Sequence, residues 1–380
     1  MKESITIRNV GPLKDIVIDD ITSLTVFIGQ SGSGKSMIMK IIVLMRYIFK
    51  RICIRSFLKN AGISRSPFKI SIETLLRDDL KIHLSKNSAE IIYTVQFENG
   101  ETYSLVFKEN KLTTPGSISN EAIYLSKEAW ISETRNIIPA WLTNPANAKG
   151  SLGFYFHETL SDFTEATKHI KHLKLNFLEA QLDIEDRNGI PRYMFTIPEK
   201  HDPIELRHAS SGIQTSAPLA LITKYFAEAF SFKEAKRRSI LSYLYDSDQL
   251  TEFHPSIELS EVPTVANIYV EEPELSLDPS SQVRMLDYLV NIAFNTATNN
   301  LTLMMATHSP YLVNALNLII NRPAGQPGLP PERVSVFKVF KGHLINLKST
   351  ANNRYTVIET ADLTEPMEAI LNDYIRLTGE

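Results

Sequence analysis

A glycine-rich segment at residues 29–36 is the strongest chemical signal in the sequence. It matches the pattern G-x-x-x-x-G-K-[ST] and lies between a predicted strand and a predicted helix. Glycines let such a loop fold its backbone N–H groups around phosphate, and the start of the helix adds positive potential. We expect Lys35 to reach the outer phosphates and the Ser36 hydroxyl to bind Mg²⁺. The residues assigned to phosphate binding are Gly29, Gln30, Ser31, Gly32, Ser33, Gly34, Lys35 and Ser36.

Two adjacent carboxylates lie at the end of a second apolar segment, Asn-Ile-Tyr-Val-Glu-Glu-Pro-Glu at residues 267–274. In that position the first acid can bind Mg²⁺ through water, and the second can polarise an attacking water molecule. An acidic helix cap would explain the carboxylates but not the apolar strand before them. We therefore assign Glu271 to the metal and Glu272 to general-base catalysis.

Two shorter segments carry polar residues that could complete a phosphate site. Residues 209–214, Ala-Ser-Ser-Gly-Ile-Gln, lie between a predicted strand and a predicted helix, where Ser-Ser-Gly alone is more often a plain helix cap. Residues 306–310, Ala-Thr-His-Ser-Pro, end another apolar strand, and a lone histidine is usually structural. Their order along the chain favours function, because it runs phosphate loop, Ser-Ser-Gly, paired acids and histidine.

Taken in this order, the motifs resemble those of ABC ATPases, in particular the RecF, SMC and OLD branch. The Glu-Glu-Pro-Glu form is most similar to OLD-like AAA ATPases. The resemblance covers residues 1–50 and about 204–320. It implies an ATPase that closes as a dimer around ATP and Mg²⁺.

The resemblance also implies roles for individual residues. Ser211, Gly212 and Gln214 correspond to a signature segment that crosses a dimer interface and faces the γ-phosphate bound by the partner chain. His308 corresponds to a switch histidine that contacts the γ-phosphate and the attacking water, and residues 275–279 resemble the loop that touches the partner chain. The catalytic residues implied are Lys35, Glu272 and His308.

Some positions depart from the family pattern. Glu271 stands where many members have aspartate, Ile213 replaces the second glycine of the signature, and no glutamine is convincing as the Q-loop residue. Residues 131–135, Ile-Ser-Glu-Thr-Arg, resemble a short arginine-containing motif that follows a strand in OLD-like ATPases. Arg135 is therefore expected either near the nucleotide, transmitting its state, or as an ordinary surface arginine.

The hydrophobic pattern indicates an α/β fold, a P-loop NTPase with a mixed, partly parallel sheet, an antiparallel β-subdomain and a helical insertion. A strand, helix and strand at about residues 265–270, 280–294 and 301–306 predict a parallel βαβ unit. We expect the following further elements: strands over 4–28, a helix from 36, antiparallel hairpins over 66–108, an amphipathic helical arm over 150–181, short strands at 193–197 and 204–206, a helix over 214–230, a loop over 321–331 and a closing helix over 363–377.

The length of 380 residues allows two or three average domains or one large domain with insertions. The motifs favour three segments. Residues 1–125 would hold the phosphate loop and the β-subdomain, residues 126–203 the helical insertion and a hairpin, and residues 204–380 the signature, the paired acids and the histidine.

Composition describes an ordinary globular protein, with 43% hydrophobic and 22% charged residues. Cys53 is the only cysteine, so an intrachain disulfide is excluded and a reducing cytoplasm fits. The start of the sequence alternates like a strand and shows no secretion signal, and the apolar run at 37–49 is too short to cross a membrane. The net charge of −3 excludes a uniformly basic surface but allows a local basic face for DNA.

The spacing of the motifs narrows the class of protein. Ser36 and Ser210 are separated by 174 positions, which excludes the long coiled coil of SMC proteins. The 72 residues after His308 carry no second carboxylate cluster, so we do not expect a nuclease domain of the OLD type. A transporter ATPase would show a clear Q-loop and a more regular signature.

The leading hypothesis is an ATPase resembling the PtuA-type ATPases of Septu and retron-associated anti-phage defence, a homodimer paired with a separately encoded nuclease or toxin effector. The alternative is a RecF-like repair ATPase that binds DNA. Two lysine and arginine clusters could contact phosphate, although such runs are usually solvated faces. They are Lys168, Lys171 and Lys174 on the expected helical arm, and Lys233, Lys236, Arg237 and Arg238.

Overall fold

The structure is a computed structural model. It describes residues 1–63, 78–84, 88–142, 153–187, 190–197, 202–246, 258–323, 325–351 and 355–378.

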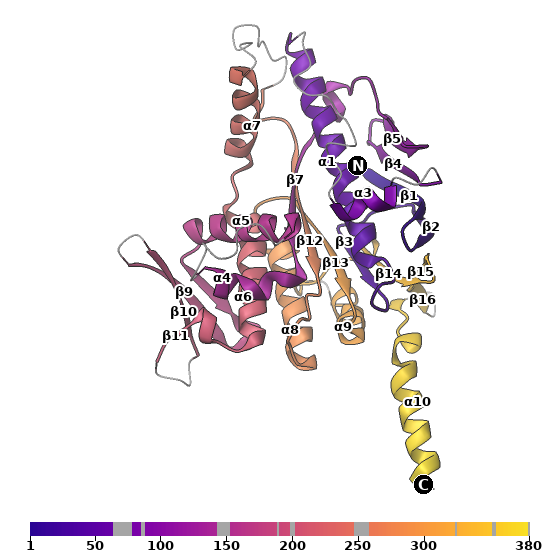
Figure 1. Cartoon of the computed structure of the whole chain (residues 1–380), viewed down its shortest axis with the longest axis vertical. Helices are drawn as coiled ribbons and strands as arrows, with labels where there is room; N and C mark the ends of the chain where they lie inside the picture. Colours follow the sequence, from indigo (N-terminus) through magenta and orange to yellow (C-terminus); the bar gives the residue numbers. More distant parts are fainter. Residues whose placement is uncertain are drawn as a thin grey trace.

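In these residues, eleven strands form one large mixed sheet at the centre of the molecule (Figure 1). The sheet order is β6 (Lys111–Thr113), β5 (Thr102–Lys108), β4 (Glu90–Gln96), β1 (Lys2–Val10), β2 (Leu13–Ile18), β15 (His343–Asn346), β14 (Val334–Phe340), β3 (Leu24–Ile28), β13 (Leu301–Thr307), β12 (Thr264–Glu271) and β7 (Leu125–Ile131). The five strands from β14 to β7 are parallel, whereas β1, β2, β4, β5 and β6 pair antiparallel. The predicted α/β fold with a mixed sheet and an antiparallel β-subdomain is confirmed.

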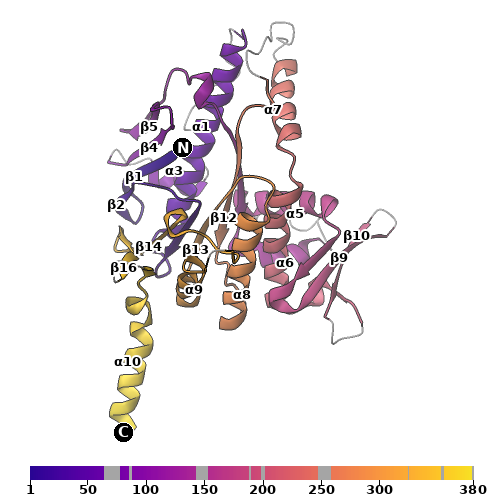
Figure 2. The same ribbon diagram turned by 180° about the vertical axis from the view of Figure 1, so that it is seen from behind.

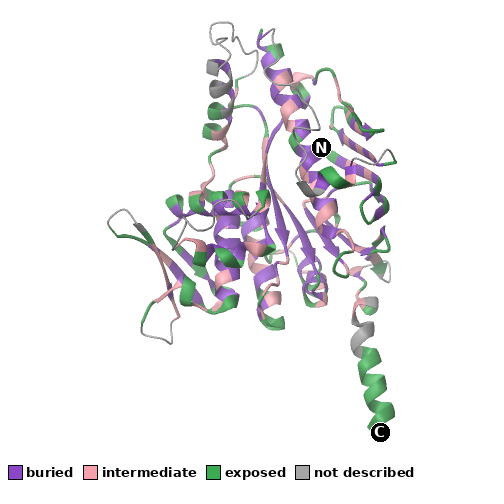
Figure 3. Ribbon diagram, viewed as in Figure 1, coloured by how far each residue is buried: buried purple, intermediate pink, exposed green. Residues whose placement is uncertain are grey.

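Helices cover both faces of the parallel strands, and the interior between the layers is buried (Figure 3). On one face lies α1 (Lys35–Asn60), packed against Phe27 and against side chains of β1, β2, β4 and β5. The other face carries Leu24, Val26 and Ile28, which share a core with α6 (Ser211–Lys224), α8 (Pro279–Val290) and α9 (Pro310–Ile320). The alternation of β3 residues between the two cores follows from the two-residue period of a strand.

A buried ion pair ties α1 to the first strand. Arg46 of α1 is 2% exposed, and its Nε donates to Glu3 Oε2 at 2.7 Å while its Nη1 donates to the Tyr269 hydroxyl at 2.9 Å. A buried charge needs such partners, because removal of either one leaves the other uncompensated. The pair therefore fixes the position of α1 relative to β1 and β12.

An insertion lies beside the central sheet. It contains α4 (Ile138–Trp141), α5 (Phe154–His169) and four described strands in the order β11 (Ile204–Glu205), β10 (Ile190–Thr196), β9 (Ala180–Arg187) and β8 (His172–Leu175). Figure 2 shows β9 and β10 next to α5 and α6. A π-helical turn at Tyr225–Ala229 extends α6, and α7 (Phe232–Asp246) follows it.

The last helix, α10 (Ala361–Thr378), projects from the body of the protein after the hairpin of β16 (Lys348–Ala351) and β17 (Tyr355–Ile358) (Figure 1). Its apolar side chains Ile370, Leu371 and Tyr374 are more than half exposed. Among the described helices, none is both long and apolar enough to span a membrane.

Several predicted elements require correction. Residues 78–84 form a helix, α3 (Asp78–Leu84), rather than part of a hairpin, because Leu80 and Leu84 are buried one helical turn apart. The predicted hairpin segments at 64–77 and 85–87 lie outside the described residues. The described part of the expected helical arm, residues 153–181, contains α5, then β8, a short 3-10 helix at Asn176–Leu178 and the start of β9.

The predicted boundary between residues 125 and 126 falls inside β7, which pairs with β12 in the central sheet. We therefore assign β7 to the sheet that carries the phosphate loop. The remaining division into segments stays a prediction.

Candidate functional site

Four parallel strands end at the same edge of the central sheet. Thr307 at the end of β13 is opposite Ile28 of β3, Glu271 of β12 is opposite Ala306, and Ile131 of β7 is opposite Val270. The loops that follow these strands therefore meet at one edge, which is the usual place for a ligand in an open parallel sheet. The phosphate loop, the paired acids, the histidine and residues 132–135 all lie in these loops.

The phosphate loop has the geometry of an anion site. Gly34 precedes α1 with φ of 105°, and a Cβ there would lie 2.5 Å from Leu13 Cδ2, so both conformation and space require glycine. No side chain caps the first N–H groups of α1, and the Ser33 hydroxyl is buried without a hydrogen-bond partner in the structure. A phosphate group would supply acceptors for these donors.

Lys35 lies at the centre of the site. Its Nζ donates to the carbonyls of Gly29 at 2.8 Å and Gln30 at 3.0 Å, and it lies 3.2 Å from His308 Nε2. Burial lowers the pKa of Lys35, while the nearby carboxylates of Glu272 and Glu274 oppose that change. The ammonium group is thus already directed toward the place where the outer phosphates would lie.

Glu272, the second of the paired acids, and His308 lie close to Lys35. Glu272 Oε1 lies 3.6 Å from His308 Nε2, and both side chains remain about one third exposed, so water can reach them. The backbone N–H of His308 donates to Glu274 Oε1 at 2.6 Å. This bond fixes the start of the histidine loop, so Lys35, Glu272 and His308 lie together as one polar cluster.

Two carboxyl groups and a hydroxyl group form a second cluster beside the phosphate loop. Glu271 shares hydrogen bonds with Glu133 and Ser36, and Trp130 Nε1 donates to Glu271 Oε2 at 3.2 Å. Burial, together with Glu133, raises the pKa of Glu271 to about 8. Hard oxygen ligands of this kind fit Mg²⁺, which typically uses one or two carboxylates together with substrate phosphates. The residues therefore fit the expected ion.

The signature residues lie on the far side of the paired acids. Ser211 begins α6 and is exposed, and Gly212 packs against the loop after Glu272, where an added Cβ would lie 2.9 Å from Ser276 O. Gln214 Nε2 donates to the carbonyls of Arg207 and Ala209, so it braces the turn before α6. A contact with the nucleotide of a partner chain stays a prediction for these three residues.

Arg135 is fully buried, so the interpretation as an ordinary surface arginine is wrong. It is part of a short helix, Glu133–Ile137, directly after β7. Its guanidinium group contacts the backbone of Glu271 and Glu272. The arginine therefore lies immediately behind the paired acids.

The two basic clusters are less available than expected. Lys236 is buried and donates to the carbonyl of Val262 at 3.0 Å, so it cannot face DNA. Lys168 pairs with Glu165 at 2.6 Å. Lys171 follows α5, and Lys174 lies in β8, so neither continues a helical basic face. The other six basic residues are exposed, so a DNA-binding ATPase stays an alternative.

Two site residues were missed in the sequence. Glu133 lies within the segment 131–135, for which the sequence suggests a role only for Arg135. It follows β7, the strand next to the one that ends in the paired acids. Glu274 was quoted as the last acid of Glu-Glu-Pro-Glu, and its bond to the His308 N–H depends on tertiary structure. The position of Glu133 shortly after a strand is the signal in the sequence that could have indicated its role.

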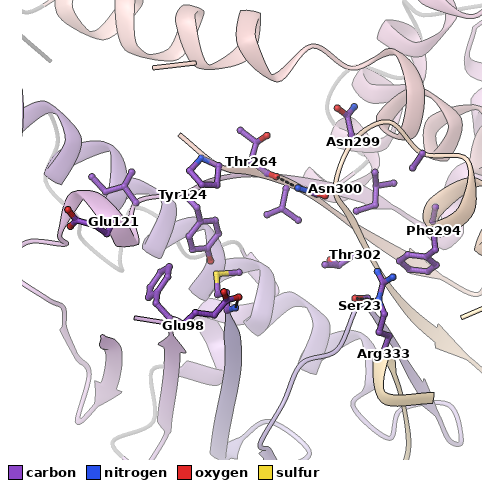
Figure 4. Close-up of a pocket in the computed structure, with 18 of the residues that line it drawn as sticks. Ser23, Glu98, Glu121, Tyr124, Thr264, Phe294, Asn299, Asn300, Thr302 and Arg333 are labelled. Atoms are coloured by element: carbon purple, nitrogen blue, oxygen red, sulfur yellow. Dashed lines mark hydrogen bonds and ion pairs between the residues drawn. The ribbon is translucent and has the colours of Figure 1, made fainter. Parts of the chain in front are cut away.

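A separate cavity of about 790 Å³ lies at the opposite end of the parallel strands (Figure 4). It is lined by the first residues of β12 and β13, among them Thr264, Leu301 and Thr302, together with Ser23 and Arg333. Because the phosphate loop follows the other end of β3, this cavity does not belong to the phosphate site.

Comparisons with known proteins identify the family of the chain. A family model described as "AAA domain, putative AbiEii toxin, Type IV TA system" matches residues 24–314. None of the curated proteins that were compared matches the chain.

Solved structures include similar chains at low sequence identity. The SMC head domain from Thermotoga maritima is 13% identical, with 92% of this chain and 100% of that chain covered and a TM-score of 0.37. An SMC head bound to the C-terminal winged-helix domain of ScpA is 11% identical, with 90% and 97% covered and a TM-score of 0.39. A dimeric ATP-binding cassette in a post-hydrolysis state with ADP and Pi is 12% identical, with 91% and 100% covered and a TM-score of 0.31.

Replacement of Glu271 by glutamine is expected to stabilise the nucleotide-free protein more at high pH than at low pH. The folded-state pKa of Glu271 is raised from 4.5 to about 8, so its favourable contribution is complete below 4.5 and is lost as pH rises through about 8. The difference in unfolding free energy should grow by at most about 1.4 kcal/mol per pH unit in that window. Chemical denaturation of both proteins with a metal chelator, at about pH 5 and about pH 8.5, measures it. Equal differences at the two pH values would contradict the shift.

Proposed function

The chain belongs to the AAA domain family of putative AbiEii toxins, and from this premise we propose that it is a switch that binds and hydrolyses ATP as a dimer. The observation that carries the proposal is the cluster of Lys35, Glu272 and His308 at the edge of the sheet, next to the phosphate loop. A cation, a base and a histidine in contact are the groups that phosphoryl transfer to water requires.

Each residue of the cluster has one task in this proposal. Lys35 holds the outer phosphates and neutralises charge that develops on them. Glu272 accepts a hydrogen bond from the attacking water and orients it, and its exposed side chain leaves room for that water. His308 lies between the two, in contact with Lys35 and near Glu272, where it can bind the γ-phosphate.

Ser36, Glu271 and Glu133 would hold Mg²⁺ beside the phosphates. The ion supplies positive charge to the phosphate oxygens when it is bound. Glu271 and Glu133 would then lose the proton that they share in its absence, because a cation favours both carboxylates in their charged form.

We further propose that Ser211 and Gly212 complete the nucleotide site of a second copy of the chain. Both lie at the N-terminus of α6, where Ser211 is exposed and Gly212 is buried beneath it, and such a helix end attracts phosphate. A two-fold interface would form two such composite sites. This arrangement makes closure of the dimer depend on ATP.

In the biological context that we propose, the switch is the ATPase component of an anti-phage defence system, similar to PtuA-type and other OLD-like ATPases, and controls a separately encoded nuclease or toxin. The family description, which refers to a toxin of a toxin–antitoxin system, supports a role in such a system.

Lys35→Ala and Glu272→Gln should separate ATP binding from hydrolysis. Lys35→Ala should weaken ATP binding about tenfold or more, because it removes a contact with the phosphates. Glu272→Gln should retain the affinity for ATP and slow hydrolysis roughly 100-fold or more, because it removes only the base. Calorimetry with ATP and measurement of phosphate release test both variants. Equal loss of ATP affinity in the two variants would refute the assignment of Glu272 as the base.

Mixing two inactive variants should restore part of the ATPase activity. Ser211→Arg spoils the site on the partner chain, and Lys35→Ala spoils the site on its own chain. A heterodimer of the two therefore has one site with both changes and one intact site. Phosphate release should rise on mixing, with ATP occupancy measured in the same samples. Absence of any recovery, at confirmed heterodimer formation and ATP occupancy, would rule out the shared sites.

Co-expression with the products of neighbouring genes tests the effector. Wild-type chain expressed alone should not arrest growth, whereas toxicity of a neighbouring effector should change when Lys35→Ala replaces the wild type. The two proteins should co-purify. Growth arrest by the chain alone, to the same extent as with its neighbours, would identify the chain itself as the toxin.

A further inference from the structure

Arg135 makes an unusual set of contacts for a buried charged residue. Its guanidinium group donates to four backbone carbonyls: Ser132 O at 3.1 Å, Thr215 O at 3.0 Å, Glu271 O at 2.7 Å and Glu272 O at 2.6 Å. The side chain is completely buried. Four of its five N–H groups therefore join three separate segments of backbone.

Two of these carbonyls belong to the turn that carries the proposed base. Glu272 has φ of 44°, a left-handed conformation that a glutamate rarely adopts unless its surroundings hold it. Its N–H donates to Ala306 O at 2.8 Å on one side, and its carbonyl accepts from Arg135 on the other. These bonds direct the Glu272 side chain toward His308.

A third carbonyl belongs to the signature helix. Thr215 O accepts from Arg135 Nε, and the Thr215 hydroxyl donates to Leu275 O at 2.9 Å. Gly212, one turn earlier, lies so close to Ser276 that a Cβ would be 2.9 Å from its carbonyl oxygen. The first turn of α6 is thus bonded directly to the loop that begins at Glu272.

We propose that Arg135 is a positioning residue that holds Glu272 in its catalytic orientation and joins it to the start of α6, so that base and signature move as one unit. The inference rests on the proposed function, since Glu272 is its base. In a closed dimer, a shift of α6 on contact with the partner's nucleotide would then displace the base of the same chain. Each chain would sense one nucleotide and act on the other.

The chemistry of the side chain suits this role. A planar guanidinium group reaches several carbonyls in fixed directions, which a lysine ammonium group cannot do. Burial lowers the pKa of Arg135 to about 10, so the group stays charged at neutral pH. The carboxylates of Glu274 and Glu272 support that charge without contacting it in an ion pair.

Arg135→Lys tests the proposal against the matched control Arg46→Lys. Both arginines are buried, but Arg46 lies in α1 and donates to Glu3 and Tyr269 rather than to the backbone of Glu272. Arg135→Lys should lower kcat about tenfold or more and change the Kd for ATP by less than about threefold relative to the wild type. The reason is that Arg135 affects the orientation of the base and not the binding of ATP. Arg46→Lys should lower thermal stability and leave kcat within about twofold.

A double-mutant cycle with Glu272→Gln distinguishes positioning from general damage. If Arg135 acts through Glu272, then Arg135→Lys should slow the Glu272→Gln protein about twofold or less. If the two losses multiply instead, the proposal is overturned. Thr215→Val, which removes the hydroxyl bonds to Leu275 O and Gly212 O, gives a second test in case Arg135→Lys does not fold, and it should lower kcat more than ATP affinity.

Measurements on the wild-type protein distinguish failure of the proposed ATPase function from failure of the proposed role of Arg135. Absence of ATP hydrolysis by the wild type, or full activity of Glu272→Gln, contradicts the proposed function. Normal hydrolysis by the wild type and slow hydrolysis by Glu272→Gln, together with normal kcat for both Arg135→Lys and Thr215→Val, contradicts the role of Arg135 alone.

Discussion

The aligned ends of four parallel strands are the constraint on which the site depends. Backbone pairing holds Ile28, Thr307 and Glu271 at the same edge, and β7 adds the segment that begins after Ile131. Because hydrogen bonds fix the pairing of the strands, short loops suffice to bring together the side chains that would bind phosphate, metal and water. Each loop reaches the site because it directly follows one of these strands.

Concentrating charge at this edge has an energetic cost. Four glutamates, at positions 133, 271, 272 and 274, face three cations, Lys35, Lys40 and Arg135, in a partly buried region. One form of compensation is the hydrogen bond between Glu133 and Glu271, where burial raises the pKa of Glu271, and another is the set of backbone carbonyls around Arg135. Buried charges persist only where such compensation exists. Nucleotide and Mg²⁺ would change this balance, which gives the protein a physical reason to respond to them.

The sequence predicts site residues where a chemically suitable residue type directly follows a predicted strand. Residues 29–36, the paired acids and His308 could be assigned because each follows an apolar strand and carries a residue type that phosphate chemistry needs. Glu133 and Arg135 could not, since their partners lie about 80 to 140 positions away and depend on the pairing of β7 with β12. The helical arm predicted over 150–181 includes β8 and the first two residues of β9, because short, partly buried segments with mixed polarity satisfy both periods.

The strand before the phosphate loop has a particular place in the sheet. Its neighbours on both sides, β13 and β14, come from the last quarter of the sequence, with Ile28 paired to Thr307 and Lys338. Contacts between residues so distant along the chain form late in folding. The entropy cost of closing a long loop must be met before these contacts can stabilise the structure. During synthesis, the first 300 residues would therefore leave the ribosome with β3 unpaired, and the ability to retain nucleotide would arise only when nearly the whole chain is available.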